Sequence, residues 1–370
     1  MKKILYFIHY PPPIHGVSTI NKYIYNSKII NKDFQKKIIK INYNRNLGGI
    51  DKLNFLKIFI YFKLLYRFIK NIIFFKPDIV YYSIPPTGFG LYKDIPFVLL
   101  LKFFSIRPLF HLHGKGIYKN TNKSFFYKKI HNYIYSNSDI IHLSKGLIDK
   151  EIKSLALYNS KFFVVNNGIK KINIKKNFKE NDCIDLLFLS NLFVSKGILF
   201  GLDVFAKLLK ENNNLKFHIV GTIPDNKTKK KILEKIKSKK ITDNIILYGA
   251  KYGKEKFDII KKMDLLFYPT FNDAYPLVLL ECLQIGIPVV ASNQGAIPEI
   301  INKNTGFIFK TGQLEDALIC ILKVIKNLES KDNYYYEQCK NSFNSKFTLD
   351  IFEENMNKVV NKVANNICVE

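Results

Sequence analysis

Short runs of β-forming residues alternate with longer amphipathic runs along almost the whole chain. Parallel strands cannot be joined by a tight hairpin, so each needs a crossover before the next strand, and that crossover is usually a helix. Regular alternation of this kind therefore predicts parallel sheets covered by helices. The strand-like runs are ILYFI, KIIKI, DIVYYSI, LFHLH, DIIHLS and KFFVVNN before Gly168, and IDLLFLS, LKFHIVG, NIILYG, DLLFYP, IPVVAS and GFIFK after it.

One interruption of the alternation divides the chain. Residues 172–182 are polar and rich in Lys and Asn, which predicts a linker. We expect two Rossmann-like parallel α/β domains, residues 1–171 and 183–345, facing each other across a cleft that binds ligands at the carboxyl ends of the strands. A chain of 370 residues is long enough to give each domain a core. Residues 346–370 predict a terminal helix that could pack back on the N-terminal domain.

The chain is strongly basic, with 58 Lys and Arg against 30 Asp and Glu, and residues 1–171 hold 29 of the bases but only 7 of the acids. Nucleic acid, an anionic membrane and a genome-wide bias toward Lys are all compatible with this charge. The five cysteines lie far apart without a metal-binding or redox pattern, which favours a reducing cytoplasm. The apolar run after Met1 is too short for a signal peptide, and we interpret it as a buried strand.

Residues 55–75 predict a helix that is apolar and basic and contains no acid. Its charges are Lys57, Lys63, Arg67 and Lys70, which interrupt the apolar runs and argue against a membrane span. An interfacial helix on an anionic bilayer fits this pattern. A core helix whose lysine stems reach the surface fits it equally. RNA is a weaker interpretation, because no nucleic-acid motif accompanies the charge.

Two acids flank the start of a predicted helix within residues 271–301. Pro276 suits a first helical turn, so Asp273 precedes the helix, Glu281 falls in its second turn, and Gly286 can end it. Backbone amides at a helix start favour an anion, which makes phosphate or polarised sugar hydroxyls suitable ligands. An N-cap followed by an ordinary helical Glu also fits these residues.

Two strand-to-helix turns carry candidate phosphate contacts. Gly16 follows the first strand, where a backbone without a side chain can approach a phosphate. Lys196 and Gly197 follow the first strand of the second domain, where an ammonium could neutralise a diphosphate. A plain turn glycine and a solvated lysine remain alternatives. The chain lacks a full Gly-x-Gly-x-x-Gly fingerprint and a Walker lysine, which argues against a dehydrogenase or a P-loop NTPase.

His111 and His113 lie two residues apart on one predicted strand, so we expect their side chains on the same face. A buried histidine with satisfied hydrogen bonds is a serious alternative to a functional one, above all for His111. Two histidines without a third ligand do not justify a metal site.

The segment DAYPLVLLECLQIGIPVVAS resembles the donor-site signature of glycosyltransferase family 4 and related retaining GT-B enzymes. That signature has two Glu residues separated by seven positions and followed by Gly-x-Pro-Val-Val. The resemblance implies that Asp273 contacts the transferred sugar and that Glu281 holds the nucleotide ribose. Because Asp is one methylene shorter than Glu, the contact of Asp273 with the sugar could be lost, water-bridged or adapted to another donor.

The resemblance spans almost the whole chain and is strongest over residues 184–309. It implies that Lys196 belongs to a pyrophosphate-binding loop, that Asn191 stands where the family often has Arg, and that His113 lies near the reacting carbon. Gly221, Tyr268 and Pro269 we interpret as fold supports, with no metal or other cofactor expected. The implied catalytic residues are His113, Asp273 and Lys196, and the implied donor-binding residues are Gly16, Asn191, Lys196, Asp273, Ala274, Tyr275, Pro276, Leu277 and Glu281.

The resemblance implies a retaining glycosyltransferase that moves a sugar from a nucleotide diphosphate sugar to a glycan or polyprenyl-linked acceptor in bacterial surface polysaccharide synthesis. We expect it in the cytoplasm, or peripheral on the inner face of the plasma membrane through Lys57, Lys63, Arg67 and Lys70. Two alternatives stay open. A GT-B nucleotide-sugar 2-epimerase would need a fuller set of acid and base groups, and a non-catalytic protein would bind nucleotide sugar or nucleic acid without turnover.

Overall fold

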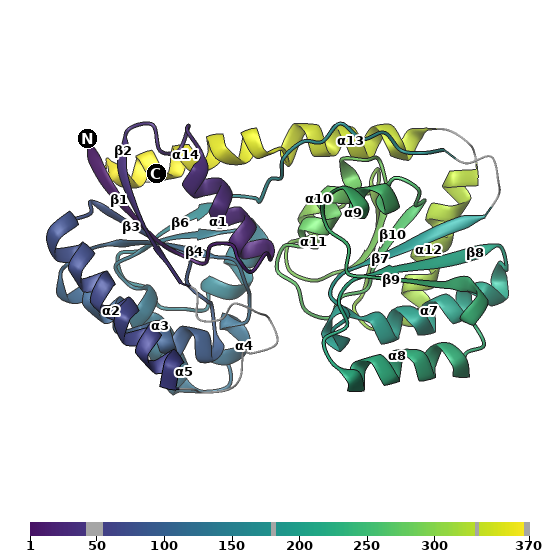
Figure 1. Cartoon of the computed structure of the whole chain (residues 1–370), viewed down its shortest axis with the longest axis horizontal. Coiled ribbons are helices and arrows are strands. Elements are labelled where there is room, and N and C mark those ends of the chain that lie inside the picture. The colour runs from purple at the N-terminus through teal and green to yellow at the C-terminus, as the bar shows by residue number, and fades with distance from the viewer. Residues whose placement is uncertain (42–54, 179–182, 330–332, 366–370) are drawn as a thin grey trace. The chain divides into compact units, whose positions relative to one another are not determined.

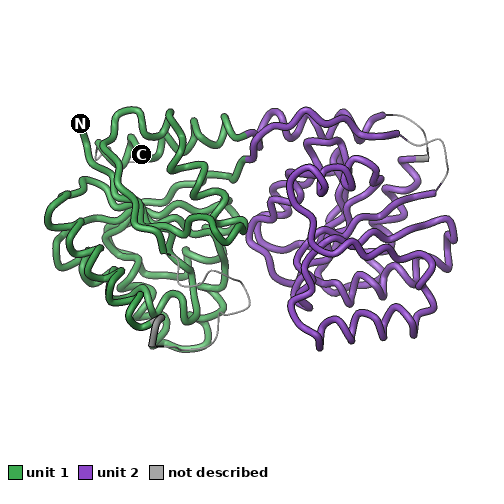
Figure 2. The backbone as a smooth tube through the Cα atoms, in the orientation of Figure 1, with its two compact units in different colours: residues 1–168, 349–370 green, residues 169–348 purple. Residues whose placement is uncertain are grey.

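The computed structural model describes residues 1–41, 55–178, 183–329 and 333–365. The chain forms two compact units. The first consists of residues 1–168 together with 349–370, and the second of residues 169–348 (Figure 2). Each unit contains a six-stranded sheet in which every strand pairing among the described residues is parallel. The predicted α/β class and the twelve predicted strands are confirmed.

The sheet of the first unit has the strand order β2-β1-β3-β4-β5-β6 (Figure 1). Its strands are β1 (Lys2–Ile8), β2 (Phe34–Lys40), β3 (Ile79–Tyr82), β4 (Pro108–Leu112), β5 (Asp139–His142) and β6 (Lys161–Val164). The helices are α1 (Gly16–Asn26), α2 (Phe55–Phe75), α3 (Gly88–Phe103), α4 (Ile117–Thr121), α5 (Phe125–Tyr135), α6 (Lys145–Leu147), a short π-helical turn η2 (Ile148–Ile152) and α14 (Leu349–Ala364).

The helix predicted over residues 55–75 is confirmed as α2, and it supplies one side of the first core. Leu64, Phe68, Ile72 and Phe75 recur at helical spacing and are buried against Phe7 and its neighbours in the sheet. Burial of each such side chain stabilises the fold by about 1.5–3 kcal/mol. None of the helices among the described residues is both long enough and apolar enough to span a bilayer.

The sheet of the second unit has the order β12-β11-β10-β7-β8-β9. Its strands are β7 (Ile184–Leu189), β8 (Leu215–Val220), β9 (Ile245–Gly249), β10 (Leu265–Tyr268), β11 (Val289–Ser292) and β12 (Gly306–Phe309). The helices are η3 (Val194–Lys196), α7 (Ile198–Glu211), α8 (Asn226–Ser238), η4 (Thr242–Asn244), α9 (Gly253–Ile260), α10 (Leu277–Leu283), α11 (Ile297–Ile300), α12 (Leu314–Glu329) and α13 (Tyr334–Lys346).

The strand order of the second sheet creates a topological switch point between β7 and β10. These two strands pair directly, with Leu265 opposite Leu186, although 75 residues of chain, 190–264, lie between the end of β7 and the start of β10. From β7 the chain adds β8 and β9 toward one edge of the sheet, and then it returns to the middle and adds β10, β11 and β12 toward the other edge. Loops that follow β7 and β10 consequently diverge at the carboxyl edge, which is where open parallel sheets bind ligands.

The segments between and after the two sheets pack on definite partners. Residues 169–178 run along the second unit, where the Ile172 amide donates to Gln284 Oε1 (3.2 Å) and the Asn177 amide donates to the Lys261 carbonyl (2.8 Å). The rest of the predicted linker, residues 179–182, lies outside the described residues. The terminal helix predicted within residues 346–370 is present as α14, and α13 precedes it. Helix α14 contacts α1 within the first unit.

Candidate functional site

Two loops meet at the carboxyl edge of the second sheet, one after β7 and one after β10. The Phe271 amide donates to the Ser195 carbonyl (2.9 Å). Gly197 has φ +84°, and a Cβ atom there would lie 1.9 Å from the Pro269 carbonyl oxygen. Only glycine fits this position, because any side chain would overlap the neighbouring backbone. The Lys-Gly pair of the sequence therefore brings the first loop against the second.

This contact places Lys196 beside Asp273. The Lys196 ammonium pairs with Asp273 Oδ2 and also donates to the Asn272 carbonyl (3.2 Å). The Tyr268 hydroxyl donates to Asp273 Oδ2 (2.6 Å), and the Ala274 amide donates to Oδ1 (2.9 Å). A carboxylate has about four acceptor positions and an ammonium three N–H bonds, so one of each remains for a ligand.

Tyr268 is a protonated donor to this pair. Burial, followed by the Asp273 carboxylate, raises the pKa of Tyr268 well above its ordinary value. Its hydroxyl therefore keeps its proton at neutral pH. Sequence reasoning treated Tyr268 only as a fold support, because a tyrosine at the end of a buried strand carries no local sign of its partner.

A third loop, between β11 and α11, closes against the same residues. Gly295 has φ +55°, and a Cβ atom there would lie 2.4 Å from the carbonyl oxygens of both Asp273 and Ala274. The Ala296 amide donates to the Ala274 carbonyl (2.8 Å). Ala274, Tyr275 and Pro276 are buried where these loops meet, and their predicted contact with a donor stays a prediction.

Helix α10 begins at Leu277, which is half-buried, and Pro276 is its N-cap residue rather than a member of its first turn. Glu281 lies in the second turn as predicted. Its Oε1 accepts from the Lys256 ammonium (2.6 Å), and its Oε2 is buried without a hydrogen-bond partner among the described residues. Lys256 was not singled out in the sequence, because 25 residues separate it from Glu281. Asn191 is exposed at the start of the loop after β7.

The first unit carries the other predicted residues. Gly16 is the exposed first residue of α1, and His15 caps that helix: Ser18 N donates to His15 Nδ1 (3.3 Å) and His15 N donates to Ser18 Oγ (3.0 Å). His111 and His113 share a face as predicted, with ring centroids 3.9 Å apart. His111 Nδ1 also lies 2.6 Å from the Tyr81 hydroxyl.

A group of neutral histidines surrounds His113. Burial, reinforced by the repulsion that protonated His142 and His9 would exert, lowers the pKa of His113 to about 3. Burial likewise lowers the pKa of His142 to about 3 and, together with His15, that of His9 to about 4. The Nε2 atoms of His111, His113 and His142 are buried without hydrogen-bond partners among the described residues. These rings can exchange hydrogen bonds with a ligand but carry no positive charge at neutral pH.

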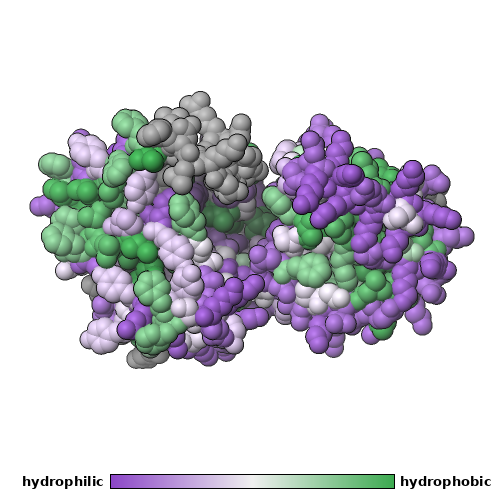
Figure 3. Space-filling view, turned by 90° about the horizontal axis from the view of Figure 1, so that it is seen from below, coloured by the Kyte–Doolittle hydropathy of each residue, from purple (hydrophilic) through white to green (hydrophobic). Residues whose placement is uncertain are grey.

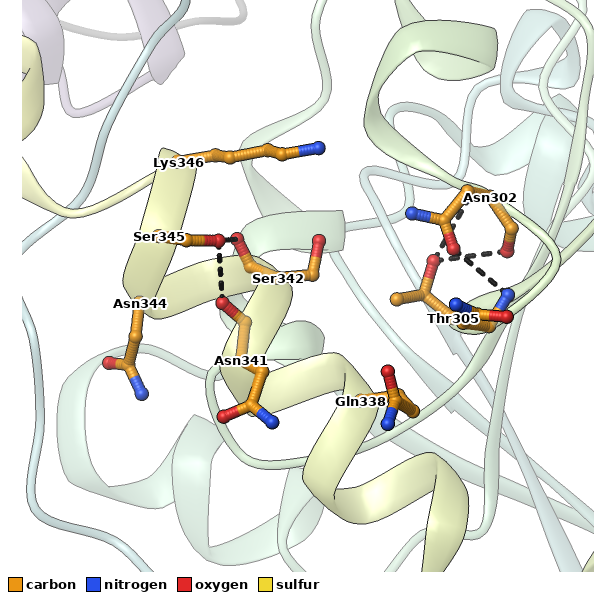
Figure 4. Close-up of a pocket in the computed structure, with 9 residues that line it drawn as sticks. Asn302, Thr305, Gln338, Asn341, Ser342, Asn344, Ser345 and Lys346 are labelled. Carbon is orange, nitrogen blue, oxygen red and sulfur yellow. Dashed lines mark hydrogen bonds between the residues drawn. The ribbon is translucent and has the colours of Figure 1, made fainter.

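A separate pocket of about 550 Å³ lies elsewhere on the second unit and is polar (Figure 4). Asn302 and Thr305 immediately precede β12, so they lie at the amino edge of the sheet, opposite the loops of Lys196 and Asp273. Asn304 belongs to the same segment, and the remaining lining side chains come from α13. Within the described parts of the chain, no three His, Cys, Asp or Glu residues gather in a metal-binding arrangement.

Residues 169–341 match the family described as glycosyl transferases group 1. The second unit is a glycosyl transferases group 1 domain. An uncharacterized glycosyltransferase of Methanocaldococcus jannaschii is 29% identical over 238 residues, covering 62% of this chain and 62% of the relative. The capsular polysaccharide biosynthesis glycosyltransferase CapH of Staphylococcus aureus is 26% identical over 221 residues, covering 59% of each chain. The chain spans 50–62% of the length of the first curated relatives that it matches.

Solved structures identify the fold. The crystal structure of HepE from Anabaena, described as a complex with UDP-glucose, has a TM-score of 0.73 at 14% identity and covers 98% of this chain and 100% of HepE. At this identity the likeness establishes the fold alone, and the fold is GT-B. The Lys196, Asp273 and Glu281 side chains belong to the group 1 domain, whereas Gly16 and His113 belong to the first unit.

We predict that Gly197→Ala destabilises the group 1 domain far more than Gly249→Ala. Both glycines have left-handed backbones, at φ +84° and +70°, but nothing lies within 4 Å of a Cβ built on Gly249. Gly249→Ala, the control, should lower the free energy of unfolding by about 1–2 kcal/mol, because only its left-handed backbone is strained. The Gly197 variant adds a backbone overlap and should lose more than about 3 kcal/mol. Denaturant unfolding measures both values, and equal losses would contradict the packing described here.

We predict that the first unit loses stability in acid because of its histidines. Unfolded histidine has a pKa near 6.5, so below that pH the unfolded chain binds protons that the folded His9, His113 and His142 do not. The free energy of unfolding should fall by up to about 1.4 kcal/mol per pH unit for each histidine between pH 6.5 and about 4. In His142→Asn this slope should be smaller, as measured by denaturant titrations at several pH values. An unchanged slope would contradict the prediction.

Proposed function

We propose that this protein is a retaining glycosyltransferase, of family 4 or close to it, that moves a sugar from a nucleotide diphosphate sugar to a glycan or polyprenyl-linked acceptor. One observation carries the proposal: Lys196, Asp273 and Glu281 all lie at the carboxyl edge of the sheet in a group 1 domain. Each of these side chains retains hydrogen-bonding capacity that the protein does not use. HepE, which shares the fold, is described in complex with UDP-glucose, and CapH is named for capsular polysaccharide biosynthesis. The first description supports a nucleotide-sugar donor, and the second supports a role in bacterial surface polysaccharide.

Departure of the diphosphate needs positive charge, and Lys196 supplies it. Its remaining N–H bond and the amides at the start of α7, a helix of 14 residues, would stabilise the negative charge that develops on the leaving phosphate. The bond from the anomeric carbon to the phosphate oxygen breaks, and a bond to the acceptor oxygen forms on the same face. The acceptor proton passes to the departing phosphate. No metal is required in this proposal, because Lys196 and the helix amides provide the charge.

The other residues have defined parts in the proposal. Asp273 accepts a sugar hydroxyl at its remaining acceptor position, and Glu281 accepts from the ribose. His113 contacts the sugar or acceptor as a neutral ring, since burial keeps its pKa low. Gly16 allows a phosphate or acceptor to approach the start of α1.

The solvent side of α2 supports a membrane surface as a partner. Phe59, Phe62 and Tyr66 are exposed by 65%, 61% and 65% at helical spacing, and Phe74 by 77%, while the opposite side of the helix fills the core. Lys63, Arg67 and Lys70 are exposed on the same helix, and the Lys57 side chain lies outside the described ones. An aromatic and basic stripe without acids suits the boundary of an anionic bilayer.

Neighbouring helices extend this surface. Phe103 in α3 and Phe125 in α5 are exposed by 80% and 73%, and Lys129 lies over the Phe125 ring at 4.8 Å. Figure 3 shows apolar and polar residues interspersed on this side of the first unit. We propose that the first unit docks peripherally on the inner face of the plasma membrane, where a polyprenyl-linked acceptor would be embedded.

We predict that Glu281→Ala and Lys196→Ala each reduce sugar transfer at least 100-fold, whereas Lys207→Ala, at an exposed ion pair of α7, leaves it nearly unchanged. The donor is first chosen by thermal shift with a panel of nucleotide sugars, because a ligand of the folded state raises the melting temperature. Transfer is then measured with matched acceptors. Near-normal rates in both variants would exclude these assignments. A 2-epimer formed without acceptor would favour an epimerase.

We predict that the protein cosediments with anionic liposomes and that this binding weakens when Lys57, Lys63, Arg67 and Lys70 are all changed to Glu. Each basic residue near an anionic surface contributes about 1 kcal/mol. In the matched control, four exposed lysines of α8, in the other unit, are changed to Glu, so that the net charge changes by the same amount. Unaltered cosedimentation of the α2 variant, or an equal loss in the control, would refute the docking surface. The control positions are the exposed α8 residues Lys227, Lys229, Lys231 and Lys237.

A further inference from the structure

Glu281 is held by the protein through only one of its oxygens. Its Oε1 accepts from Lys256 Nζ (2.6 Å), while its Oε2 is buried and unpaired among the described residues. A buried acceptor without a partner destabilises a fold, and the effect is larger when the acceptor is charged. Such an atom in a native fold calls for an explanation, and a ligand that donates a hydrogen bond is one.

The pair lies where the topology puts the site. In a parallel sheet each crossover helix starts at the carboxyl edge, so the first turn of α9, which contains Lys256, is at that edge. Glu281 lies in the second turn of α10, eight residues after Asp273. The side chains of Lys256 and Glu281 are 18% and 15% exposed, so solvent screens their attraction only partly.

Lys256 differs from the other lysines of its helix. Lys254, two residues earlier, is exposed, and Lys261, just after the helix, pairs with Asp258 on the surface. The ammonium of Lys256 instead reaches the neighbouring helix α10. A residue that fixes a carboxylate in this way also neutralises a charge that would otherwise repel a diphosphate.

We propose that Lys256 is a positioning residue for the nucleotide: it fixes Glu281 through Oε1 and leaves Oε2 directed at a ribose hydroxyl. This inference rests on the proposed function, since it assumes that the group 1 domain binds a nucleoside diphosphate. A site built around an acceptor of this kind discriminates against a ligand that lacks the hydroxyl, because Oε2 then stays unpaired. Lys256 thus contributes to the selection of ribonucleotides over deoxyribonucleotides.

Titration calorimetry of Lys256→Met and Lys254→Met tests the proposal. The ligands are UDP, GDP and ADP, together with their 2′-deoxy and 3′-deoxy forms. Lys256→Met should bind the preferred ribonucleotide about 10-fold or more weakly than the unaltered protein, because the ribose loses its hydrogen bond to the charged Glu281 carboxylate. The affinity for the deoxy form that lacks the relevant hydroxyl should fall less than about 3-fold in Lys256→Met, because this ligand makes no contact with Oε2 in the unaltered protein either. Lys254→Met removes the same charge and should change each affinity by less than about 2-fold.

Two further variants separate positioning from folding. Lys256→Arg keeps a cation within reach of Oε1 and should recover part of the affinity. In a Glu281→Gln background, Lys256→Met should have little additional effect, because the two residues act through one contact. Retained binding of the deoxy nucleotide shows that Lys256→Met still folds.

Each remaining outcome overturns a stated claim. Equal losses for ribonucleotide and deoxyribonucleotide, or an equal loss in Lys254→Met, would overturn the role of Lys256 while the proposed function stands. If the unaltered protein binds none of the nucleoside diphosphates, the proposed function fails and this inference fails with it.

Discussion

The close approach of Gly197 to the Pro269 carbonyl is the contact on which the candidate site depends. Strands β7 and β10 are neighbours in the sheet but distant in the chain, and their following loops are joined by this contact. Without a Cβ at residue 197 the two backbones meet, and the Lys196 ammonium then reaches Asp273. Gly295 makes a similar approach from the loop after β11. Backbone packing, more than side-chain attraction, therefore sets the position of the charged groups.

The acids of this site are compensated by lysines. Asp273 is matched by Lys196 and Glu281 by Lys256, and each pair is mostly buried. Such pairs add little net stability, because removing charges from water offsets much of their attraction. Their value is geometric, since each pair fixes one acid while leaving hydrogen-bonding capacity for a ligand. Asp273 stands where the family signature has the longer Glu, and it also accepts hydrogen bonds from the Tyr268 hydroxyl and the Ala274 amide.

The first unit uses its two sides differently. On the inside, the histidines near His113 are buried, and burial suppresses their charge. Its outer surface instead presents the aromatic and basic residues of α2, with Phe59 and Phe62 in solvent. A helix that is apolar on both sides is unusual at the surface of a protein, because the exposed apolar area gains nothing from water. The sequence left an interfacial helix and a core helix as alternatives, and α2 buries one side in the core while it exposes aromatic and basic side chains on the other.

Local patterns determined the parts of the fold that depend on local physics. The twelve strands, helix α2, the tail helices and the helical spacing of Glu281 all follow from periodicity, turn residues and burial of neighbouring side chains. The resemblance to a known signature marked Lys196, Asp273 and Glu281 without giving their partners. Tertiary structure alone decided that Tyr268 donates to Asp273 and that Lys256 pairs with Glu281. These partners come from different loops and helices, and the order of strands in the sheet brings them together. No local propensity encodes that order, because it arises from how whole crossovers pack on the sheet.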